Sequence, residues 1–333
     1  MTTLLPPYYH PTTICFIDDN ASFLRALSID LPDDYLFISY LHPDEAIAAI
    51  NTPDPLPPLV DRCFSLDNSD PSTPIIRLDL SVLENEIKLI ERFRRLSVLM
   101  IDYAMPVFDG LELCAEIKDK TLKKALLTGV AEEKTAVAAF NQGLIDSYIP
   151  KRLITDGNKI IPYAEALKKA YFDQYSARLS SNLALNPPGF MTEERVAEYF
   201  HSVIEAQHIV EYYLVSEPYG YLMLRANGSM LRLVFYSESE RREQITTAQA
   251  HQAPAHIMQQ LTSGQSIGFL HERPEDYLGF EAYPWDDAML PATVIQGEQT
   301  WYAGIAANPP ADIDFDPKAS SYDQYLAQRK TTG

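Results

Sequence analysis

The sequence predicts a doubly wound α/β domain with a five-stranded parallel sheet, followed by a smaller α+β domain. Two observations lead to this prediction. In the first half, short apolar segments recur and end directly in polar residues, which is typical of strands buried on both faces of a parallel sheet. In the second half, three runs rich in β-branched and aromatic residues are separated by turn sequences, which indicates an antiparallel meander. A chain of 333 residues has room for both domains.

The elements of the first domain are predicted to alternate between strand and helix. The strands are expected at residues 13–17, 35–40, 97–101, 125–127 and 147–150. Helices are expected to begin at Asn20, which can cap the helix, at Pro43, which fits a first turn, at residue 131, and at Pro162. The third of these ends at Gly143, because glycine tolerates the left-handed conformation that closes a helix. The fourth reaches about Leu183 and leaves the domain.

Polar residues stand at the carboxyl ends of four of these apolar segments. They are Asp18 and Asp19, Asp102, Thr128 and Lys151. The carboxyl ends of parallel strands lie at one edge of the sheet, where open α/β folds bind their ligands. We therefore expect these side chains in one small acidic pocket. A single aspartate at a strand end is more often a solvated terminus or a helix cap, but the joint occurrence of four such positions argues against that interpretation.

Three carboxylates brought together repel one another, and a hard divalent cation removes this conflict. Mg²⁺ is suitable because it accepts one or two carboxylates together with waters and a phosphate oxygen. Asp102 can then act as a nucleophile toward a phosphoryl group and form an aspartyl phosphate. Thr128 would donate a hydrogen bond to one phosphoryl oxygen, and the ammonium of Lys151 would neutralise another.

Residues 13–151 resemble the receiver domain of bacterial two-component response regulators. The resemblance rests on the acidic pair, the stretch Asp102-Tyr-Ala-Met-Pro-Val-Phe-Asp-Gly110, Thr128 and Lys151. Their intervals also fit, because Thr128 follows Asp102 by 26 residues and Lys151 follows Thr128 by 23. The resemblance implies Asp102 as the phosphoacceptor and a sensor histidine kinase or phosphotransfer protein as the donor. It implies no enzyme activity beyond the protein's own phosphotransfer and dephosphorylation.

The resemblance also assigns the remaining site residues. Asp19 is implied to be the direct Mg²⁺ ligand, Asp18 a ligand acting through water, and the backbone carbonyl of Ala104 a third ligand beside Asp102. Tyr148 is implied to be the aromatic switch residue that turns inward when Thr128 is drawn to the phosphate. The chain departs from the pattern at Arg152, where receivers usually have a proline in a cis peptide. Ala104 and Val130 are apolar where receivers often hold polar side chains, so we expect a persistent phosphoryl group.

The receiver pattern is interrupted by an insertion at residues 51–95. Asp19 and Asp102 are 83 residues apart, about twice what a plain receiver needs. The first part of the insertion is rich in proline, and the second part, roughly 78–96, is predicted to be helical because its apolar residues form a stripe. Two interpretations stay open: this helix packs on the sheet, or it forms a surface for a partner or a dimer.

The second domain is predicted from its own turn and cap signals. A helix capped by Thr192 reaches His208, and the meander follows, with turns at Pro218–Gly220 and Asn227–Gly228. Two helices near 240–251 and 254–264 and strands at 266–270 and 300–306 complete it. The expected organisation is a receiver over 12–155, a helical linker over 156–189, an output domain over 190–310 and a loose C-terminal tail over 311–333.

Charge and composition exclude several function classes. The first 155 residues contain 14 Lys and Arg against 23 Asp and Glu, and the remainder contains 13 against 23. DNA binding requires a cationic face, so no nucleic-acid partner is expected. The three cysteines are too few and too widely spaced for a disulfide framework. No segment resembles a signal peptide or a membrane span, so we expect a cytoplasmic protein without membrane association.

The output half contains none of the cyclase, phosphodiesterase or hydrolase signatures that we considered, and its histidines are not spaced as metal ligands. The stretches Val98–Pro106, Lys124–Gly129 and Ala139–Gly143 are similar to regulators without a DNA-binding domain, and in particular to the Legionella-type quorum-sensing response regulators. This resemblance implies a homodimer. We expect phosphorylation of Asp102 to switch dimerisation or partner binding. The alternative is an output domain that binds a nucleotide or another small-molecule messenger, for example on the tyrosine-rich face of its meander.

Overall fold

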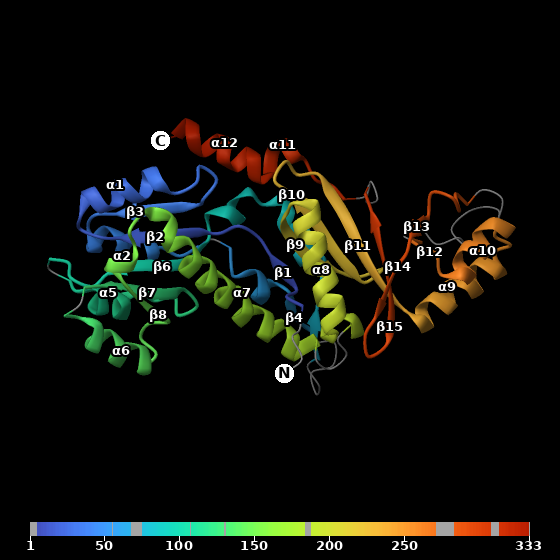
Figure 1. Ribbon diagram of the computed structural model, residues 1–333, viewed down its shortest axis with the longest axis horizontal. Coiled ribbons are helices and arrows are strands. Elements are labelled where there is room, and N and C mark those ends of the chain that lie inside the picture. Colours follow the sequence, from blue (N-terminus) through green and yellow to red (C-terminus); the bar gives the residue numbers. More distant parts are fainter. Residues whose placement is uncertain are drawn as a thin grey trace. The chain divides into compact units, whose positions relative to one another are not determined.

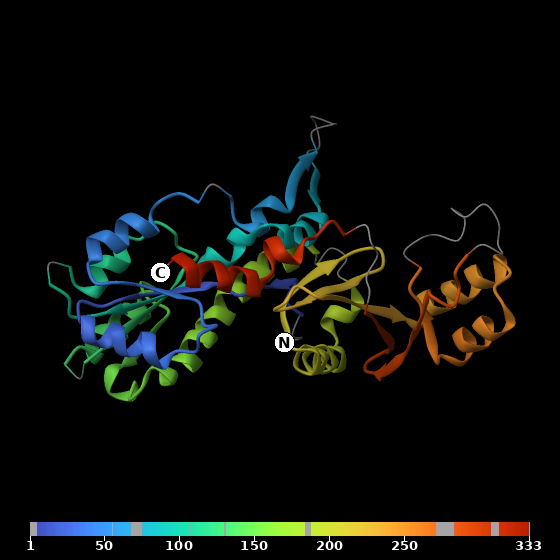
Figure 2. The same ribbon diagram turned by 90° about the horizontal axis from the view of Figure 1, so that it is seen from above.

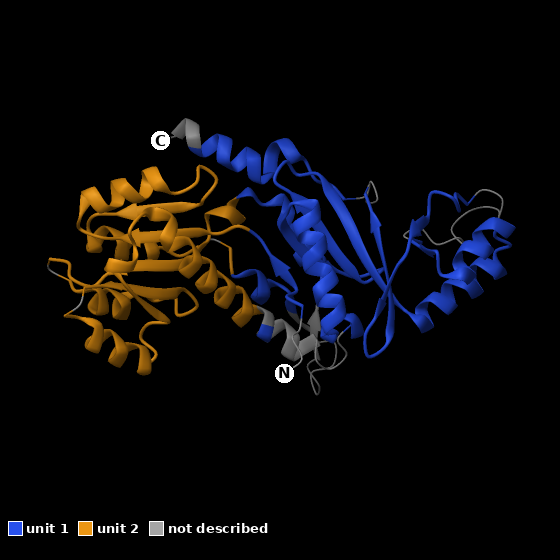
Figure 3. Cartoon of the chain, in the orientation of Figure 1, with its two compact units in different colours: residues 1–10, 58–90, 176–333 blue, residues 11–57, 91–175 orange. Residues whose placement is uncertain are grey.

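The chain forms two compact units, which are coloured separately in Figure 3. The computed structural model describes residues 5–54, 56–67, 75–106, 108–129, 131–183, 188–270, 283–307 and 313–332. The unit made of residues 11–57 and 91–175 is called the α/β unit below. The unit made of residues 1–10, 58–90 and 176–333 is called the α+β unit.

The α/β unit is built on a parallel sheet of five strands, as the sequence predicts. Their order is β3-β2-β6-β7-β8, so the second strand of the unit lies at one edge and the first beside it. The strands are β2 (Thr13–Ile17), β3 (Phe37–Tyr40), β6 (Leu96–Asp102), β7 (Lys123–Thr128) and β8 (Ser147–Pro150) (Figure 1). The inner strands β2, β6 and β7 are almost entirely buried, which explains the apolar runs 14–17, 98–101 and 125–127 within them.

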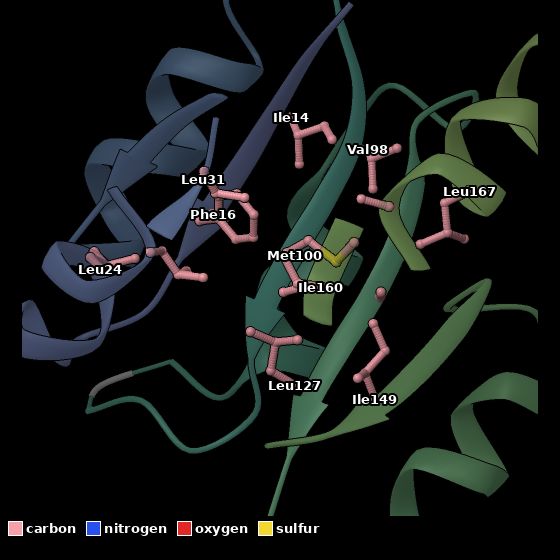
Figure 4. Packing of buried hydrophobic residues seen from close by; sticks show 13 residues of the cluster. Ile14, Phe16, Leu24, Leu31, Val98, Met100, Leu127, Ile149, Ile160 and Leu167 are labelled. Atoms are coloured by element: carbon pink, nitrogen blue, oxygen red, sulfur yellow. The ribbon is translucent and has the colours of Figure 1, made fainter. Parts of the chain in front are cut away.

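Helices cover both faces of this sheet (Figure 2). On one face, side chains of α1 (Ala21–Asp30) and α7 (Ile161–Leu183) pack against alternate residues of the strands, including Phe16, Met100 and Leu127 (Figure 4). The other helices of the unit are α2 (Pro43–Ile50), α5 (Gly110–Glu116) and α6 (Glu133–Asn141). The predicted helix starts at Asn20 and Pro43 are confirmed. Gly143 has φ of 71°, as expected for the residue that ends α6.

The insertion is less regular than the sequence suggests. It contains α3 (Leu59–Arg62), the strands β4 (Phe64–Asp67) and β5 (Ile75–Leu78), α4 (Ser81–Asn85) and the 3₁₀ helices η1 (Glu86–Lys88) and η2 (Ile90–Arg94). The single helix predicted over 78–96 is therefore wrong. The apolar stripe is real, since Leu83, Ile87 and Phe93 are fully buried, but it is divided among three short turns.

Most of the insertion belongs to the α+β unit. Residues 58–90 cluster with that unit, and α4 packs against its strand β9 (Ile209–Val215). The hydroxyl of Ser320 donates to the carbonyl of Lys88 at 2.8 Å. Of the two interpretations left open, packing on a sheet is therefore observed for α4, but the sheet is that of the second domain.

The α+β unit is built on a six-stranded antiparallel sheet with the order β1-β9-β10-β11-β15-β14. The predicted meander is confirmed as β9, β10 (Gly220–Arg225) and β11 (Met230–Ser237). The sheet is extended on one side by β15 (Thr300–Ala306) and β14 (Thr293–Gln296), and on the other by β1 (Tyr8–Tyr9). The N-terminal strand β1 was not expected. The meander tyrosines Tyr212, Tyr213, Tyr221 and Tyr236 are buried in the core, so they offer no open face to a ligand.

Helices and a small second sheet complete the α+β unit. They are η5 (Gly189–Thr192), α8 (Glu194–Gln207), α9 (Glu238–Ala250), α10 (Ala255–Ser263) and a two-stranded sheet of β12 (Ser266–Gly268) and β13 (Met289–Pro291). The predicted cap of α8 is wrong, because Glu193 occupies the N-cap position and the hydroxyl of Thr192 donates instead to the carbonyl of Gly189.

The C-terminal segment is not the loose tail that the sequence suggests. It forms α11 (Pro317–Ser320) and α12 (Tyr322–Thr332), and Tyr322 and Tyr325 on α12 are buried. Within the described ranges, no helix has both the length and the apolar character required to cross a bilayer.

Candidate phosphoacceptor site

Strand pairing brings the predicted site residues to one edge of the sheet in the α/β unit. Ile17 of β2 pairs with Ile101 of β6, so Asp18 and Asp102 follow at the same level. Asp102 itself pairs with Leu127 of β7, the residue before Thr128. Thr128 pairs with Pro150 of β8, the residue before Lys151. The four strand ends therefore deliver their polar residues in register.

The ammonium of Lys151 lies between two carboxylates. Its Nζ is 2.7 Å from Oδ2 of Asp18 and 2.8 Å from Oδ1 of Asp102. The side chains of Asp18 and Asp102 are 1% and 9% exposed, whereas that of Lys151 is 31% exposed. Buried carboxylates require paired or hydrogen-bonded partners, and one cation supplies both here. A single positive charge thus faces two negative charges from neighbouring strands.

Burial and the ion pairs change the protonation equilibria of this cluster. Burial raises the pKa of Asp18, and the hydrogen bonds from Lys151 and from the backbone N–H of Asn20 only partly counteract it. For Lys151, burial alone would lower the pKa, but the hydrogen bonds to Asp102 and Asp18 outweigh burial, and the pKa is raised. The ammonium therefore stays charged at neutral pH, and Asp18 is the carboxylate that burial makes costly to ionise.

The hydroxyl of Thr128 has no hydrogen-bond partner although it is buried. Thr128 is 1% exposed, and its Oγ1 is among the few buried polar side-chain atoms of the described residues without a partner. A buried hydroxyl without a partner costs free energy, which suggests that the missing partner is a ligand. Tyr148, the predicted switch residue, pairs with Leu126 of β7 and is 36% exposed, so its ring is turned toward solvent in this conformation.

The donor set at this edge fits a hard divalent cation. Asp18, Asp19 and Asp102 each place a carboxylate oxygen so that these oxygens lie within 4.8 Å of one another. Carboxylate oxygens are hard ligands of the kind that Mg²⁺ accepts, usually one or two of them together with waters and a phosphate oxygen. Asp19 is exposed and so remains accessible to solvent. Ala104 lies on the exposed loop after β6, two residues beyond Asp102, where its backbone carbonyl is predicted to contribute.

The turn after Asp102 depends on Gly110. The backbone N–H of Gly110 donates to the carbonyl of Tyr103 at 2.9 Å, and Asp109 caps α5 with a reciprocal capping box. A Cβ on residue 110 would lie 2.5 Å from the backbone oxygen of Asp102 and 2.8 Å from Cδ2 of Leu126. The absence of a side chain at this position therefore allows the loop to fold against the end of β6.

We predict that Gly110→Ala destabilises the protein by about 1–3 kcal/mol, the usual cost of adding a methyl group to packed interior. The main-chain carbonyl of Asp102 would have to move, so labelling of Asp102 by a phosphodonor should also slow. Chemical denaturation and the initial rate of labelling measure the two effects. Gly143→Ala serves as a comparison, because a Cβ there meets nothing within 4 Å although φ is 71°. It should lower stability without slowing labelling.

The chain departs from the receiver pattern at Arg152, which follows Lys151, and at the apolar residues Ala104 and Val130. The structure describes the first departure but not Val130. The peptide bond after Lys151 is trans, since Glu217–Pro218 is the cis bond recorded among the described residues. Lys151 begins the short 3₁₀ helix η3 (Lys151–Leu153), and Arg152 forms an ion pair with Glu133 at the start of α6. Val130 lies outside the described residues, so its expected effect on the phosphoryl group stays a prediction.

Two residues near the site were not identified from the sequence as parts of it. The ring of Phe23, on the first turn of α1, lies with its centroid 5.2 Å from Nζ of Lys151, a cation–π distance. Asn20 caps α1 through its side chain and also donates its backbone N–H to Oδ1 of Asp18 at 2.9 Å. The cap was predicted from Asn20, but its hydrogen bond to the carboxylate was not.

The α+β unit shows no comparable cluster within its described part. The acidic group at the strand ends of the α/β unit is the one set of potential metal ligands found in the ranges described above. His256 is exposed, and its Nε2 lies 2.8 Å from Oδ1 of Asp286. A cavity of about 400 Å³ lies between α9 and the start of η5, and its lining includes Phe190, Glu240 and Trp301.

Comparison with solved structures relates the whole chain to a response regulator. The response regulator LqsR of Legionella pneumophila is 27% identical, and the match covers 98% of this chain and 97% of LqsR with a TM-score of 0.78. No family model and no curated protein matches the chain. Over nearly its full length, the chain therefore shares its architecture with LqsR, including the receiver-like parallel sheet and the antiparallel sheet.

Other solved structures match about half of the chain. An adenylate cyclase from Rhodopirellula baltica is 22% identical, with 53% of this chain and 98% of that chain covered and a TM-score of 0.34. A CheY-like receiver domain protein from Methanospirillum hungatei JF-1 is 15% identical, with 49% and 98% covered and a TM-score of 0.32. The relation to response regulators rests on the match to LqsR.

Proposed function

We propose, on the premise that the chain has the architecture of a two-component response regulator, that Asp102 accepts a phosphoryl group from a sensor histidine kinase or phosphotransfer protein. Phosphorylation would then switch dimerisation or partner binding by the α+β unit. The observation that carries the proposal is the placement of Lys151 between Asp18 and Asp102, beside a buried Thr128 hydroxyl without a partner. Such an arrangement has the two functional groups that a bound phosphoryl group needs, a cation and a hydroxyl donor.

The protein's own residues divide the work of the transfer. An oxygen of Asp102 attacks phosphorus, and the bond from phosphorus to the donor's histidine nitrogen breaks with its electron pair going to that nitrogen. Lys151 offsets charge on one phosphoryl oxygen, and Thr128 donates its unused hydroxyl to another. Water later cleaves the acyl phosphate to give inorganic phosphate and the free carboxylate. The proposed reaction needs no further catalytic group.

A divalent cation completes the proposal. Asp18, Asp19 and Asp102 would hold Mg²⁺, together with the carbonyl of Ala104. The ion would neutralise the carboxylates and draw phosphoryl oxygens toward the site, which is the usual contribution of Mg²⁺ to phosphoryl transfer. Lys151 alone offers one positive charge to two buried carboxylates, so a second source of positive charge fits this cluster.

The output step is tested by measuring molecular mass in solution. We expect beryllofluoride with Mg²⁺, which mimics a phosphoryl group on aspartate, to shift the full chain from monomer toward homodimer. Light scattering coupled to size exclusion gives the mass with and without the mimic. Asp102→Asn should show no shift under either condition. An unchanged mass and shape for a chain that demonstrably binds beryllofluoride would contradict the dimer switch while leaving the phosphoacceptor site intact.

A second candidate function is binding of a small polar ligand by the α+β unit. The cavity of about 400 Å³ favours it, because its volume lies in the range of small-molecule sites and its lining combines the exposed aromatic ring of Tyr219 with the carboxylate of Glu240. The buried tyrosines of the meander do not contribute to this candidate. A ligand bound there would raise the melting temperature of the full chain in a screen of nucleotides and related messengers.

A further inference from the structure

The chain passes between the two units four times, and two of these passages lead into the strands that carry the acidic cluster. The passages lie between residues 10 and 11, 57 and 58, 90 and 91, and 175 and 176. The first leads from β1 into β2, which ends at Asp18 and Asp19. The third leads from η1 into η2 and β6, which ends at Asp102. Each of these strands therefore has the candidate site at its carboxyl end and a connection to the α+β unit at its amino end.

On the side of the α+β unit, both connections lead to the same strand. The residues Tyr8 and Tyr9 of β1 pair with Tyr213 and Tyr212 of β9. The helix α4 of the insertion, which precedes η1, packs against β9 as well. Strand β9 is thus the element of the α+β unit that adjoins both chain segments leading to the phosphoacceptor edge.

On the side of the α/β unit, the amino ends of β2 and β6 are hydrogen-bonded to each other. The hydroxyl of Thr12 donates to Oγ of Ser97 at 2.7 Å, and the hydroxyl of Thr13 donates to the carbonyl of Phe93 at 2.8 Å. The backbone N–H of Thr13 also donates to the carbonyl of Arg95 at 2.9 Å. The pairing of the two strands shifts register here, so the second strand carries an extra residue at Ser97.

These contacts join the amino ends of the two strands directly. Thr12, Thr13 and Ser97 are at most 4% exposed, so water does not compete for their hydrogen bonds. Strands β2 and β6 are neighbours and are buried along nearly their whole length, and close-packed interiors transmit small displacements instead of absorbing them.

We propose that the phosphorylation state of Asp102 is communicated along β2 and β6 to their hydrogen-bonded amino ends, and from there to β9. The two connecting segments lead from β2 to β1 and from β6 to the insertion, and β1 and the insertion both contact β9. The inference rests on the proposed function, because it needs the site to bind a phosphoryl group. It assigns the insertion the role of a second route, beside β1, from the α+β unit to the strands of the acidic cluster, in place of a surface for an external partner.

The test is hydrogen exchange of the full chain with and without beryllofluoride and Mg²⁺. In the unmodified chain, we expect exchange in peptides covering Ile209–Val215 and Ser81–Lys88 to change about fivefold or more, a common size for allosteric coupling. The double variant Thr12→Val with Ser97→Ala removes both partners of the buried hydroxyl pair, which leaves no unsatisfied group. It should still bind beryllofluoride, with the same rise in melting temperature, but lose most of the change at β9.

The matched control is Thr121→Val, which removes a hydroxyl hydrogen bond to Asp119 in an exposed turn of the α/β unit. This variant should leave the change in exchange at β9 unaltered.

A second test variant has two glycines inserted after His10. The insertion loosens the connection between β1 and β2 without touching the site, so the change in exchange at β9 should also become smaller. If the double variant keeps the full response, or if the unmodified chain binds beryllofluoride without any change at β9, the inference is wrong. Failure to bind beryllofluoride at all would instead count against the phosphoacceptor assignment.

Discussion

Replacement of Asp102 by asparagine is expected to abolish covalent labelling of the protein by acetyl phosphate. Of the three clustered carboxylates, Asp102 is the one that can form an acyl phosphate while paired with Lys151, because Asp18 is fully buried and Asp19 is outside the ion pair. The amide of asparagine is not nucleophilic toward phosphorus. Labelling is measured by the mass increase of the intact protein, and an acyl phosphate is identified by its loss in hydroxylamine.

Two controls make this result interpretable. Asp119→Asn changes an exposed carboxylate that accepts hydrogen bonds in a turn of the same unit, and it should label like the unmodified chain. Lys151→Ala keeps the nucleophile but removes the cation beside it, so it should label more slowly than the unmodified chain or lose the label faster. Equal labelling of the asparagine variant would mean that another residue accepts the phosphoryl group, and the proposed function would fail at its first step.

The sequence predicts the α/β unit well because its signals are local. Four of the five strands contain an apolar run that ends in a polar residue, and the helix caps are encoded within a few residues, as Asn20 and Gly143 illustrate. Parallel strands also place their carboxyl ends at one edge whatever the details of packing. The proximity of Asp18, Asp102 and Lys151 therefore follows from the pattern before any coordinates are known.

The parts that were predicted incorrectly depend on contacts between distant segments. Strand β1 consists of Tyr8 and Tyr9, too short to show alternation, and it forms only because β9 offers an edge about 200 residues later. The C-terminal helix α12 becomes ordered where Tyr322 and Tyr325 are buried, which composition alone does not reveal. In the insertion, the apolar stripe predicts one helix, but its residues are buried by α4 and the two 3₁₀ helices η1 and η2.

Within the site, the sequence identifies the residue types but not how charge is balanced. It does not show that one ammonium serves two carboxylates, or that Phe23 lies beside that ammonium. Phe23 follows the cap of α1 and reads as an ordinary core residue, since its position relative to Lys151 depends on the packing of α1 against the sheet. The unpartnered hydroxyl of Thr128 likewise becomes visible only when all neighbouring groups are placed.

Replacement of Asp18 by asparagine is expected to stabilise the protein in the absence of divalent cations. Burial raises the pKa of Asp18, so the folded protein holds this proton more tightly than the unfolded chain does. Stability therefore falls as pH rises from the ordinary carboxyl pKa of 3.8 through the raised value, and the full penalty remains at neutral pH. Asparagine resembles the protonated acid and carries no such penalty. In EDTA at pH 7, the variant should melt at a higher temperature than the unmodified chain.

The same substitution should reverse the order of stability when Mg²⁺ is added. A ligand that binds only the folded state stabilises it by about 2.7 kcal/mol at a concentration one hundred times its dissociation constant. The unmodified chain should gain on this scale, whereas Asp18→Asn loses a charged ligand from the acidic cluster and should gain little. In EDTA, the difference between the two proteins should also vanish as pH falls well below 3.8, where Asp18 is protonated in both the folded and the unfolded state. Thermal melts across pH and Mg²⁺ concentration measure all three effects. A variant that Mg²⁺ stabilises as strongly as the unmodified chain would show that the ion binds elsewhere, because a cation held by this cluster cannot be indifferent to the loss of its most buried carboxylate.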